Sequence, residues 1–471
     1  MPVAGSPQPC AMALTSAAKF PSLRQRQQTA KMSISSPTRR QPAARATVSA
    51  LRRACGAALL AFALSLPPVD GAAQPRAETA DGAAALLARA AARIDAGRAL
   101  EGAEAARRAY GLAGSRAARF LAARLAGAGY FRAGRFLRAE WWLRRALTHA
   151  PQPSARQAVA REMAALSAAR PLNLRLRLSL APNSNVNNGA AADTVTLWSL
   201  PFVLSPDARA LAGLEASAGL EGTYRLGRSA AGETRLGLAL YGRGFVLSPQ
   251  ARRLAPGARG ADYAFARAEA ALTRLWRPAS GAGRISLELR AGRDWYGGAP
   301  YSRYGRLSVA RGFGPRPKGA LRLAGSYERR VLAASGAASD TLALEAGGVR
   351  PLAGGDSLAW TLAASRTGSD APEAANTALR AGLRYGFARP VLGAGLSLAL
   401  ALERRDFAFS PYAPGGRQDL SLSAGASLLF PGLSYMGFSP SLSLEWRRTI
   451  SSISLFSRNA AALRLGVQSD F

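Results

Sequence analysis

From Leu172 onward the chain alternates, residue by residue, between aliphatic side chains and small, polar or charged ones. The first such segment reads LNLRLRLSL over residues 172–180, and the pattern recurs at 235–241, 284–290 and 396–403. Successive side chains of a strand point to opposite faces, so each segment predicts a strand with one aliphatic and one polar face. A helix would instead repeat its apolar residues three and four apart. Residues 171–471 are therefore expected to form a sheet.

Segment length, aromatic placement and the lack of a second core all favour a membrane barrel over a soluble sandwich. The segments run for about 10–16 residues, the length of a tilted transmembrane strand with its extensions. A solvated face with this much Leu would be a larger apolar patch than soluble monomers tolerate. Aromatic residues cluster near segment ends, as in interfacial girdles: Trp276, Trp295, Tyr296, Tyr301, Tyr304, Phe407, Phe409, Tyr412, Phe430 and Tyr435.

We expect an antiparallel barrel of 14 strands, since single-chain bacterial barrels have an even number. Closure gives every backbone N–H and C=O a partner within lipid. The expected strands lie at 172–181, 210–226, 232–246, 261–276, 283–295, 301–313, 318–331, 339–350, 356–366, 376–389, 392–407, 417–430, 436–449 and 459–471.

The last expected strand ends on an aromatic residue. Leu463, Leu465, Val467 and Phe471 share one face, and Arg464 lies on the other. A terminal aromatic after alternating apolar residues resembles the signal by which bacterial outer-membrane barrels are recognised. We therefore assign these four residues to barrel assembly, with the barrel assembly machinery and outer-membrane lipid as expected partners.

Charged side chains are expected on the face that lines the lumen. A basic lumen would favour anionic or polar passengers, although a general bias toward Arg explains the charge equally well, because only three of the 62 basic residues are Lys. The expected lumen charges are Arg175, Arg177, Arg235, Arg243, Arg284, Glu288, Arg290 and Arg464.

Residues 74–170 have no strand-like alternation and predict a helical domain. The stretch 134–151 matches the second helix of a tetratricopeptide repeat, and a weaker copy lies 37 residues upstream, where 96–98 parallels 133–135. A third helix pair is incomplete at 154–169. Such stacks usually bind a peptide or protein on their concave face, but a helical spacer without a ligand stays open. The residues assigned to repeat structure are Gly127, Tyr130, Gly134, Ala139, Ala146 and Pro151.

Residues 1–73 are interpreted as a secretory signal. Basic residues at 39–53 precede an apolar run of 13 residues, Ala54 to Leu66, and small residues at 71–73 place cleavage after Ala73. Residues 1–31 are interpreted as an over-extended gene start. Both cysteines, Cys10 and Cys55, precede that cleavage, so the mature chain is expected to have no thiol.

Composition argues against most enzymes and against nucleic-acid binding. The net charge of +34 is spread over every segment without a nucleic-acid-binding motif. The single histidine, His149, excludes His-based triads and multi-His metal sites. Gly312-Phe313-Gly314 lacks the Lys-Ser/Thr ending of a phosphate-binding loop. We therefore expect no catalytic centre, metal, cofactor or nucleic-acid partner.

The order of signal, short repeat domain and barrel resembles the surface lipoprotein assembly modifiers of Gram-negative bacteria. The similarity covers roughly 78–471 and depends on the Asn-rich motif at 182–188, the stretch 208–214 and the close at 457–471. The resemblance implies an outer-membrane barrel with a periplasmic amino-terminal domain. It further implies that client proteins, commonly lipoproteins, are moved from the periplasm to the cell surface.

The Asn-rich motif permits two interpretations. Asn183, Asn185, Asn187 and Asn188 could form only a turn, since Asn tolerates left-handed backbone and bonds its own chain. Alternatively, their amides bind an extended client in the lumen or hold the loop at 182–209 as a plug. At the level of the whole protein, a polysaccharide exporter, a general porin with a repeat domain and a barrel hydrolase remain the competing functions.

Overall fold

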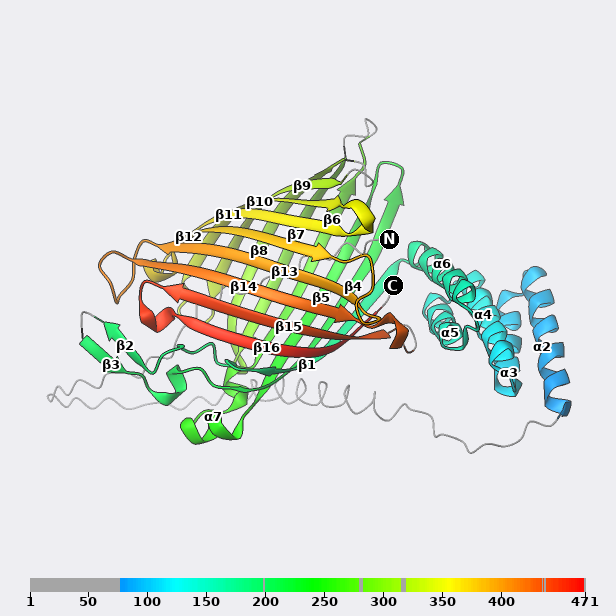
Figure 1. Ribbon diagram of the computed structural model, residues 1–471. Helices are drawn as coiled ribbons and strands as arrows, with labels where there is room; N and C mark the ends of the chain where they lie inside the picture. Colours follow the sequence, from blue (N-terminus) through cyan, green and yellow to red (C-terminus); the bar gives the residue numbers. More distant parts are fainter. Residues whose placement is uncertain are drawn as a thin grey trace, which may run out of the picture. The chain divides into compact units, whose positions relative to one another are not determined.

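The computed structural model describes residues 77–197, 200–278, 283–314, 319–433, 435 and 438–469. The expected signal at 1–73 and the terminal Phe471 lie outside these ranges. Within them the chain forms a series of helices followed by a closed antiparallel barrel (Figure 1). None of the helices in the described ranges combines the length and apolar character needed to cross a bilayer.

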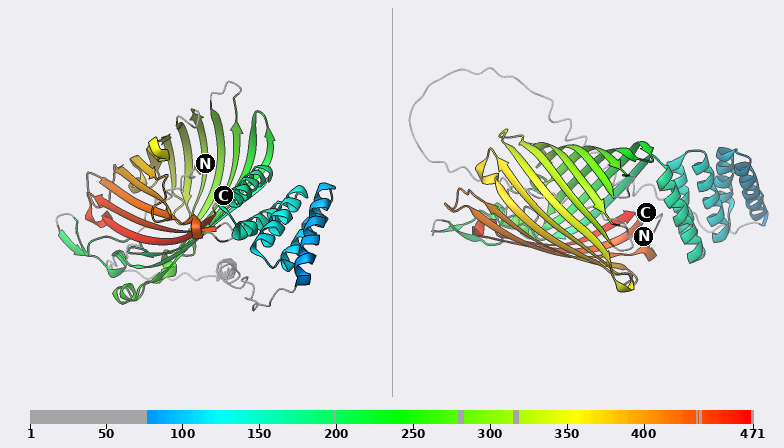
Figure 2. Two further views of the ribbon diagram at one scale, coloured as in Figure 1. Left: turned by 45° about the vertical axis from the view of Figure 1, so that its right-hand side comes forward. Right: turned by 90° about the horizontal axis from the view of Figure 1, so that it is seen from above.

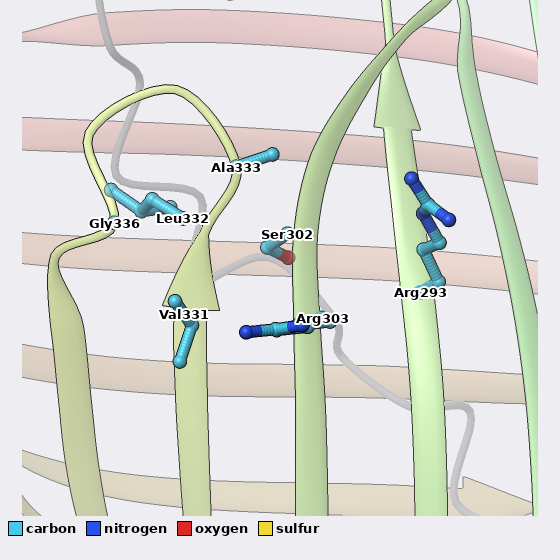
Figure 3. Close-up of a pocket in the computed structure, with 7 residues that line it drawn as sticks. All are labelled: Arg293, Ser302, Arg303, Val331, Leu332, Ala333 and Gly336. Atoms are coloured by element: carbon cyan, nitrogen blue, oxygen red, sulfur yellow. The ribbon is translucent and has the colours of Figure 1, made fainter.

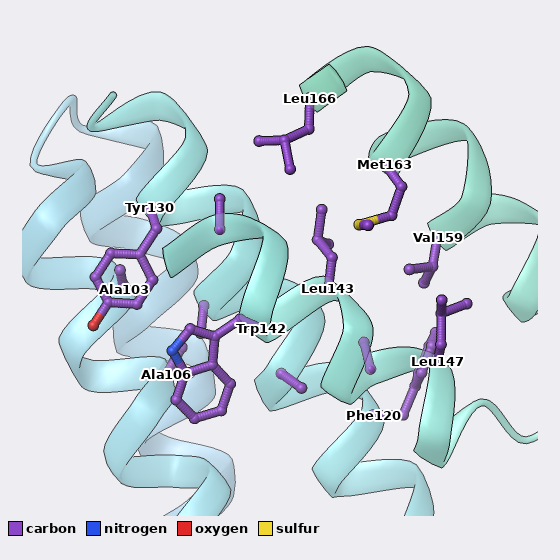
Figure 4. Close-up of a cluster of buried hydrophobic side chains, with 14 of the residues drawn as sticks. Ala103, Ala106, Phe120, Tyr130, Trp142, Leu143, Leu147, Val159, Met163 and Leu166 are labelled. Carbon is purple, nitrogen blue, oxygen red and sulfur yellow. The ribbon is translucent and has the colours of Figure 1, made fainter. Parts of the chain in front are cut away.

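Each of the five helices that precede the barrel packs against the next along the chain, and the first also packs against the third. A cluster of aromatic and larger aliphatic side chains, including Tyr130, Trp142 and Leu143, is buried in the centre of this helical region (Figure 4). The helices are α2 (Ala77–Asp95), α3 (Ala99–Leu112), α4 (Arg116–Arg132), α5 (Phe136–His149) and α6 (Pro153–Ala169).

The 37-residue sequence repeat corresponds to repeated backbone geometry. Gly97 and Gly134 end α2 and α4 with φ of 80° and 71°, a left-handed conformation that Gly adopts without strain. In both turns the next residue donates its backbone N–H to the carbonyl five residues back, at 2.8 Å. The two helix pairs are therefore joined by the same turn.

Fourteen strands close the barrel, each antiparallel to its neighbours. The fourteen expected segments each overlap one of them, so the predicted strand number and fold class are confirmed (Figures 1 and 2). The strands are β1 (Leu172–Asn183), β4 (Gly213–Ser229), β5 (Gly232–Leu247), β6 (Phe265–Trp276), β7 (Arg284–Tyr296), β8 (Ala299–Phe313), β9 (Ala320–Leu332), β10 (Ala338–Pro351), β11 (Ser357–Ser369), β12 (Asn376–Gly386), β13 (Gly395–Phe407), β14 (Arg417–Leu429), β15 (Phe438–Ser451) and β16 (Arg458–Ser469).

The sequence pattern did not predict the structure within the loops. A separate hairpin, β2 (Thr194–Leu197) with β3 (Leu200–Val203), lies between β1 and β4. It contacts the short helix of the β15–β16 loop, where the Thr196 backbone N–H donates to Ser454 Oγ at 3.4 Å. That short helix is η7 (Ser454–Phe456), and the other loop helices in the described residues are η1 (Pro206–Ala208), α7 (Pro249–Leu254), η2 (Gly260–Tyr263), η4 (Ala353–Gly355), η5 (Pro372–Ala374) and η6 (Pro431–Leu433).

The aliphatic face of the strands points outward. Leucines in the middle of neighbouring strands remain exposed, including Leu238, Leu289, Leu344, Leu379 and Leu400. The intervening polar residues face the lumen, where they bond across strands. The barrel therefore reverses the usual arrangement of a soluble protein, with apolar side chains outside and charges inside.

Candidate functional site

The site begins where β1 ends, at the seam between the first and last strands. Asn183 Nδ2 donates to Glu215 Oε2 of β4 at 3.1 Å, and Arg464 Nη1 of β16 lies 3.3 Å from the other carboxylate oxygen. Arg464 also donates to Ser179 Oγ at 3.0 Å and lies 3.5 Å from Glu445. Glu215 is buried, and these partners offset the cost of removing its carboxylate from water.

Asn185 is buried, and its side chain bonds backbone groups of the chain on both sides of the barrel seam. Its Nδ2 donates to the carbonyl of Gly189 at 2.9 Å and to that of Asn459 at 3.2 Å. Gly189 in turn donates its N–H to Asn185 Oδ1 at 2.8 Å. The side chain thereby links the start of the first loop to the beginning of β16, across the barrel seam.

Asn187 joins the two ends of the long β1–β4 loop. Its Nδ2 donates to the carbonyls of Asp207 at 2.9 Å and Arg209 at 2.6 Å. The backbone N–H of Leu211 donates to Asn187 Oδ1 at 2.9 Å. Asn188 follows with φ of 55°, the left-handed backbone that Asn tolerates.

The motif therefore contains both a turn, at Asn188, and a set of amides that hold the following loop. The amide hydrogen bonds described for Asn185 and Asn187 lead to backbone atoms of the chain itself. These bonds hold the two ends of the β1–β4 loop together, and the plug and client binding both stay predictions. Client binding by the same amides would have to displace these bonds.

The lumen wall is lined with cross-strand ion pairs. Asp294 of β7 is almost fully buried and lies 2.7 Å from Arg267 and 2.6 Å from Arg330. Ser302 Oγ donates to the same carboxylate at 3.0 Å. Nearby, Arg290 lies 3.1 Å from Glu269, which also accepts a hydrogen bond from Tyr304.

Sequence reasoning named seven lumen arginines and only one acidic partner, Glu288, and it missed other lumen arginines such as Arg267 and Arg330. Arg177 pairs with Glu221 at 2.6 Å, and Arg235 pairs with Glu233. Glu221 lies on β4, next to the strand of Arg177, whereas Glu233 lies on β5, the strand of Arg235 itself. The alternating pattern places both acids on the correct face without indicating which arginine they meet. Asp294 could have been found by this signal, because it shares a face with Arg290.

The residues assigned to barrel assembly lie on the outer face. Leu463, Leu465 and Val467 are exposed on β16, in line with the predicted alternation. Phe471 is not among the described residues. Its assigned role therefore stays a prediction.

The repeat residues lie at close helix contacts. A Cβ on Gly127 would come within 2.7 Å of Leu143, and Tyr130, Ala139 and Ala146 are buried. Tyr130 donates its hydroxyl to Glu104 at 2.6 Å, and this hydrogen bond lowers the pKa of Glu104. Pro151 follows the end of α5 at His149.

A hollow of about 320 Å³ lies on the surface between α2 and α3. Five of its lining residues are charged and three are aliphatic. The lining residues are Leu86, Arg89, Arg93, Leu100, Glu101, Glu104, Ala105 and Arg108.

His149 forms a second polar contact in the helical region. Its Nε2 lies 2.7 Å from Tyr110 Oη, to which Arg145 also donates at 3.0 Å. Burial, followed by the charges of Arg119, Arg145 and Arg116, lowers the pKa of His149. A neutral imidazole that accepts from the tyrosine hydroxyl fits this environment. In the described ranges, no three His, Cys, Asp or Glu side chains gather to hold a metal ion.

No protein-family model and no curated protein sequence matches this chain. Among solved structures it is similar to a BenF-like porin from Pseudomonas fluorescens Pf-5, with 10% identity, a TM-score of 0.35, and coverage of 63% of this chain and 98% of that one. It is also similar to CdiB from Acinetobacter baumannii, with 10% identity, a TM-score of 0.31, and coverage of 63% and 60%. The anion-selective porin from Comamonas acidovorans aligns with 14% identity, a TM-score of 0.30, and coverage of 64% and 99%.

Proposed function

We propose that this protein resides in the outer membrane and assists the translocation or display of client proteins, in particular lipoproteins, from periplasm to cell surface. The observation that carries the proposal is the direct continuity between the helical region and the first strand of a closed, charge-lined barrel. Only Arg170 and Pro171 separate α6 from β1. A protein-binding repeat placed there would deliver a segment to one mouth of the barrel.

The outward leucines support a membrane location. In water they would form a continuous apolar belt around the barrel, far larger than soluble monomers tolerate. In a bilayer the same belt contacts acyl chains, and barrel closure leaves no strand edge to lipid. Antiparallel barrels with such belts are typical of bacterial outer membranes.

The junction between helices and barrel is held by a charged contact. Arg170, just after α6, pairs with Glu140 of α5 and donates from Nε to Asn173 Oδ1 of β1 at 2.7 Å. Glu140 also accepts from Arg144 at 2.7 Å. This network links α5, the residue after α6 and β1 by hydrogen bonds and ion pairs. A delivery role would use such a link to hold the connection between the helical region and the first strand.

The lumen suits a polar, extended passenger. Its ion pairs present both signs of charge along the wall, so a polypeptide can exchange hydrogen bonds with the wall as it passes. We assign no catalytic step to the protein, and folding or capture of the client outside would supply the driving force. The periplasmic side is assigned to the helical region and the cell surface to the β1–β4 loop.

The test is co-expression with the lipoprotein encoded beside this gene, followed by surface labelling of intact cells. Deletion of the protein should abolish labelling while the lipoprotein remains in the cell. Loss of exported glycan with surface proteins intact would instead favour the polysaccharide exporter. Solute uptake without any change in surface proteins would favour the general porin.

The Asn-rich motif provides a sharper variant. Asn185→Ala with Asn187→Ala should release the β1–β4 loop and reduce client display severalfold at normal barrel yield. Asn376→Ala is the matched control, because Asn376 makes a similar amide bond to a loop carbonyl, that of Ala374, at 2.8 Å elsewhere in the barrel. Unchanged display in the double variant would remove the motif from the proposal.

A further inference from the structure

Two arginines occupy opposite register positions on the outside of the barrel, and no acidic side chain among the described residues pairs with either of them. Arg293 of β7 is directly opposite Arg303 of β8 in the strand register, and both are exposed. Opposite residues of an antiparallel pair have Cβ atoms about 5 Å apart, where like charges destabilise the sheet. Among the described residues, neither guanidinium has a hydrogen-bond or ion-pair partner. The arrangement therefore needs an external anion.

Both side chains lie where the outward aliphatic belt ends. Along β7 the outward positions run through Ile285, Leu287 and Leu289 before reaching Arg293. On β8 the corresponding neighbour of Arg303 in the belt is Leu307, which pairs with Leu289. The arginines thus occupy the level at which a bilayer changes from acyl chains to headgroups.

A hollow of about 390 Å³ lies beside the pair (Figure 3). Its other walls are Ser302, the end of β9 and the β9–β10 turn, with Val331, Ala333 and Gly336. In Figure 3, Arg303 extends from β8 toward Val331, while Arg293 lies on the adjoining strand. The hollow has room for a phosphate group between cationic and apolar walls.

The surroundings distinguish this pair from other outward charges. Arg293 lies 5.5 Å from the centre of the Trp295 ring, an aromatic of the kind that anchors barrels at the interface. On β9, Arg329 is already paired with Asp340 at 3.2 Å, and Tyr327 donates to the same carboxylate at 2.5 Å. By contrast, no acidic side chain among the described residues compensates the charges of Arg293 and Arg303.

We propose that Arg293 and Arg303 bind the phosphate of a membrane-lipid headgroup on the outside of the barrel. A guanidinium group can donate two parallel, directional hydrogen bonds to the oxygens of one phosphate. The belt directly below supplies Leu289 and Leu307 for the lipid's acyl chains, which a free phosphate would not use. This site rests on the membrane location in the proposed function, but it is independent of the client.

Three probes separate the sources of binding energy. The full chain is folded in detergent micelles, and native mass spectrometry measures retention of phosphatidic acid, of diacylglycerol and of inorganic phosphate. Phosphatidic acid carries both a phosphate and acyl chains. Diacylglycerol carries only the acyl chains, and inorganic phosphate carries only the phosphate. We expect retention of phosphatidic acid, little of diacylglycerol, and displacement by inorganic phosphate only at far higher concentration.

Substitution locates the site. Arg293→Gln with Arg303→Gln should weaken phosphatidic acid binding roughly 30-fold, since each basic residue near an anionic lipid surface contributes about 1 kcal/mol. Arg329→Gln, the matched control, should change binding less than about twofold. Arg293→Lys with Arg303→Lys keeps the charge without the paired geometry and should show an intermediate loss. It replaces the Gln variant if that variant does not fold.

Two results would overturn the proposal. Phosphatidic acid retained equally by the double Gln variant would remove these arginines from lipid binding. Inorganic phosphate bound as tightly as phosphatidic acid would assign the pair to a soluble ion. Client display in cells is a separate measurement, so failure of the lipid site and failure of the export role are distinguishable.

Discussion

The helical region and the barrel use the same kinds of side chain in opposite directions. In the helices, Trp142 and Leu143 are buried in the centre, while arginines cover the surface. In the barrel, Leu344 and its counterparts face outward, and Arg267 and Arg330 point inward onto Asp294. The difference is the one expected if water surrounds the helices and lipid surrounds the barrel, as the proposed membrane location requires.

The largest effect is expected from truncating the centre of the helical region. Trp142 is 6% exposed and packs edge-on against Tyr110. Trp142→Ala should cost about 3–5 kcal/mol of stability in that region because a large cavity remains. Limited proteolysis of the full chain should show cleavage within 77–169 while the barrel stays resistant.

The neighbouring tryptophan is the control. Trp141 is exposed and contacts Arg145 through its ring face, at 4.6 Å. Trp141→Ala should cost about 1 kcal/mol or less. Equal protease sensitivity of both variants would contradict the buried centre assigned to the helices.

The next effect tests the outer face of the barrel directly. Leu344 is 63% exposed at mid-strand, and Leu137 on α5 is 57% exposed. Leu344→Arg should destabilise the barrel by about 2–4 kcal/mol in a bilayer, because the charge meets acyl chains. Leu137→Arg should change the stability of the helices by about 0.5 kcal/mol or less, since that position faces water.

The free energy of unfolding of the barrel is measured by urea unfolding of the protein in lipid vesicles. The gel shift of the compact, folded band monitors the folded fraction. If Leu344→Arg were as neutral as Leu137→Arg, the outward leucines would face water or protein. The membrane location would then have to be abandoned.

A smaller effect distinguishes the glycines of the two regions. Gly134 ends α4 with φ of 71°, whereas Gly242 of β5 has ordinary strand backbone and open space where a Cβ would lie. Gly134→Ala should cost about 1–2 kcal/mol through the left-handed backbone. Gly242→Ala should be neutral or stabilise by up to about 1 kcal/mol. Thermal unfolding of the full chain measures both, and reversed signs would refute the shared turn geometry.

The strands were predictable because alternation depends on local sequence alone. Each segment of alternating Leu identified its own strand, and closure followed from the lack of any second layer. The hairpin β2–β3 was missed because four-residue strands inside a loop give too short a pattern to separate from a turn. The loop-holding role of Asn187 was one of two open alternatives, since its acceptors lie about 20 residues away in sequence.

The charged sites were only half predictable. Alternation places Asp294 and Arg290 on one face, but partners such as Arg267 and Arg330 are set by the register between strands. The outward pair Arg293 and Arg303 was invisible for the same reason, because their opposition depends on a bulge between Asp294 and Trp295 that shifts the pairing. Register is a property of the closed sheet, and no single strand contains it.

The smallest predicted effect is a pH dependence confined to the helical region. Burial and three nearby arginines lower the pKa of His149 below its usual value near 6.5. The folded helices therefore bind fewer protons than the unfolded chain between that lowered value and 6.5. Stability should be complete above 6.5 and should fall as the pH drops from 6.5 toward the lowered pKa, with no further loss from this group below it.

Because His149 is the only histidine, the imidazole C–H resonances of the protein all belong to it, and an NMR titration of the full chain reads its pKa directly. Tyr110→Phe removes the hydroxyl that contacts Nε2 but keeps the ring, so most of the lowered pKa should remain. Arg145→Gln should raise the pKa of His149 by removing one of the repelling charges. A pKa above 6.5 in the unmodified protein would contradict the buried, arginine-surrounded position. The barrel sequence contains no histidine, so this acid sensitivity should separate helices from barrel.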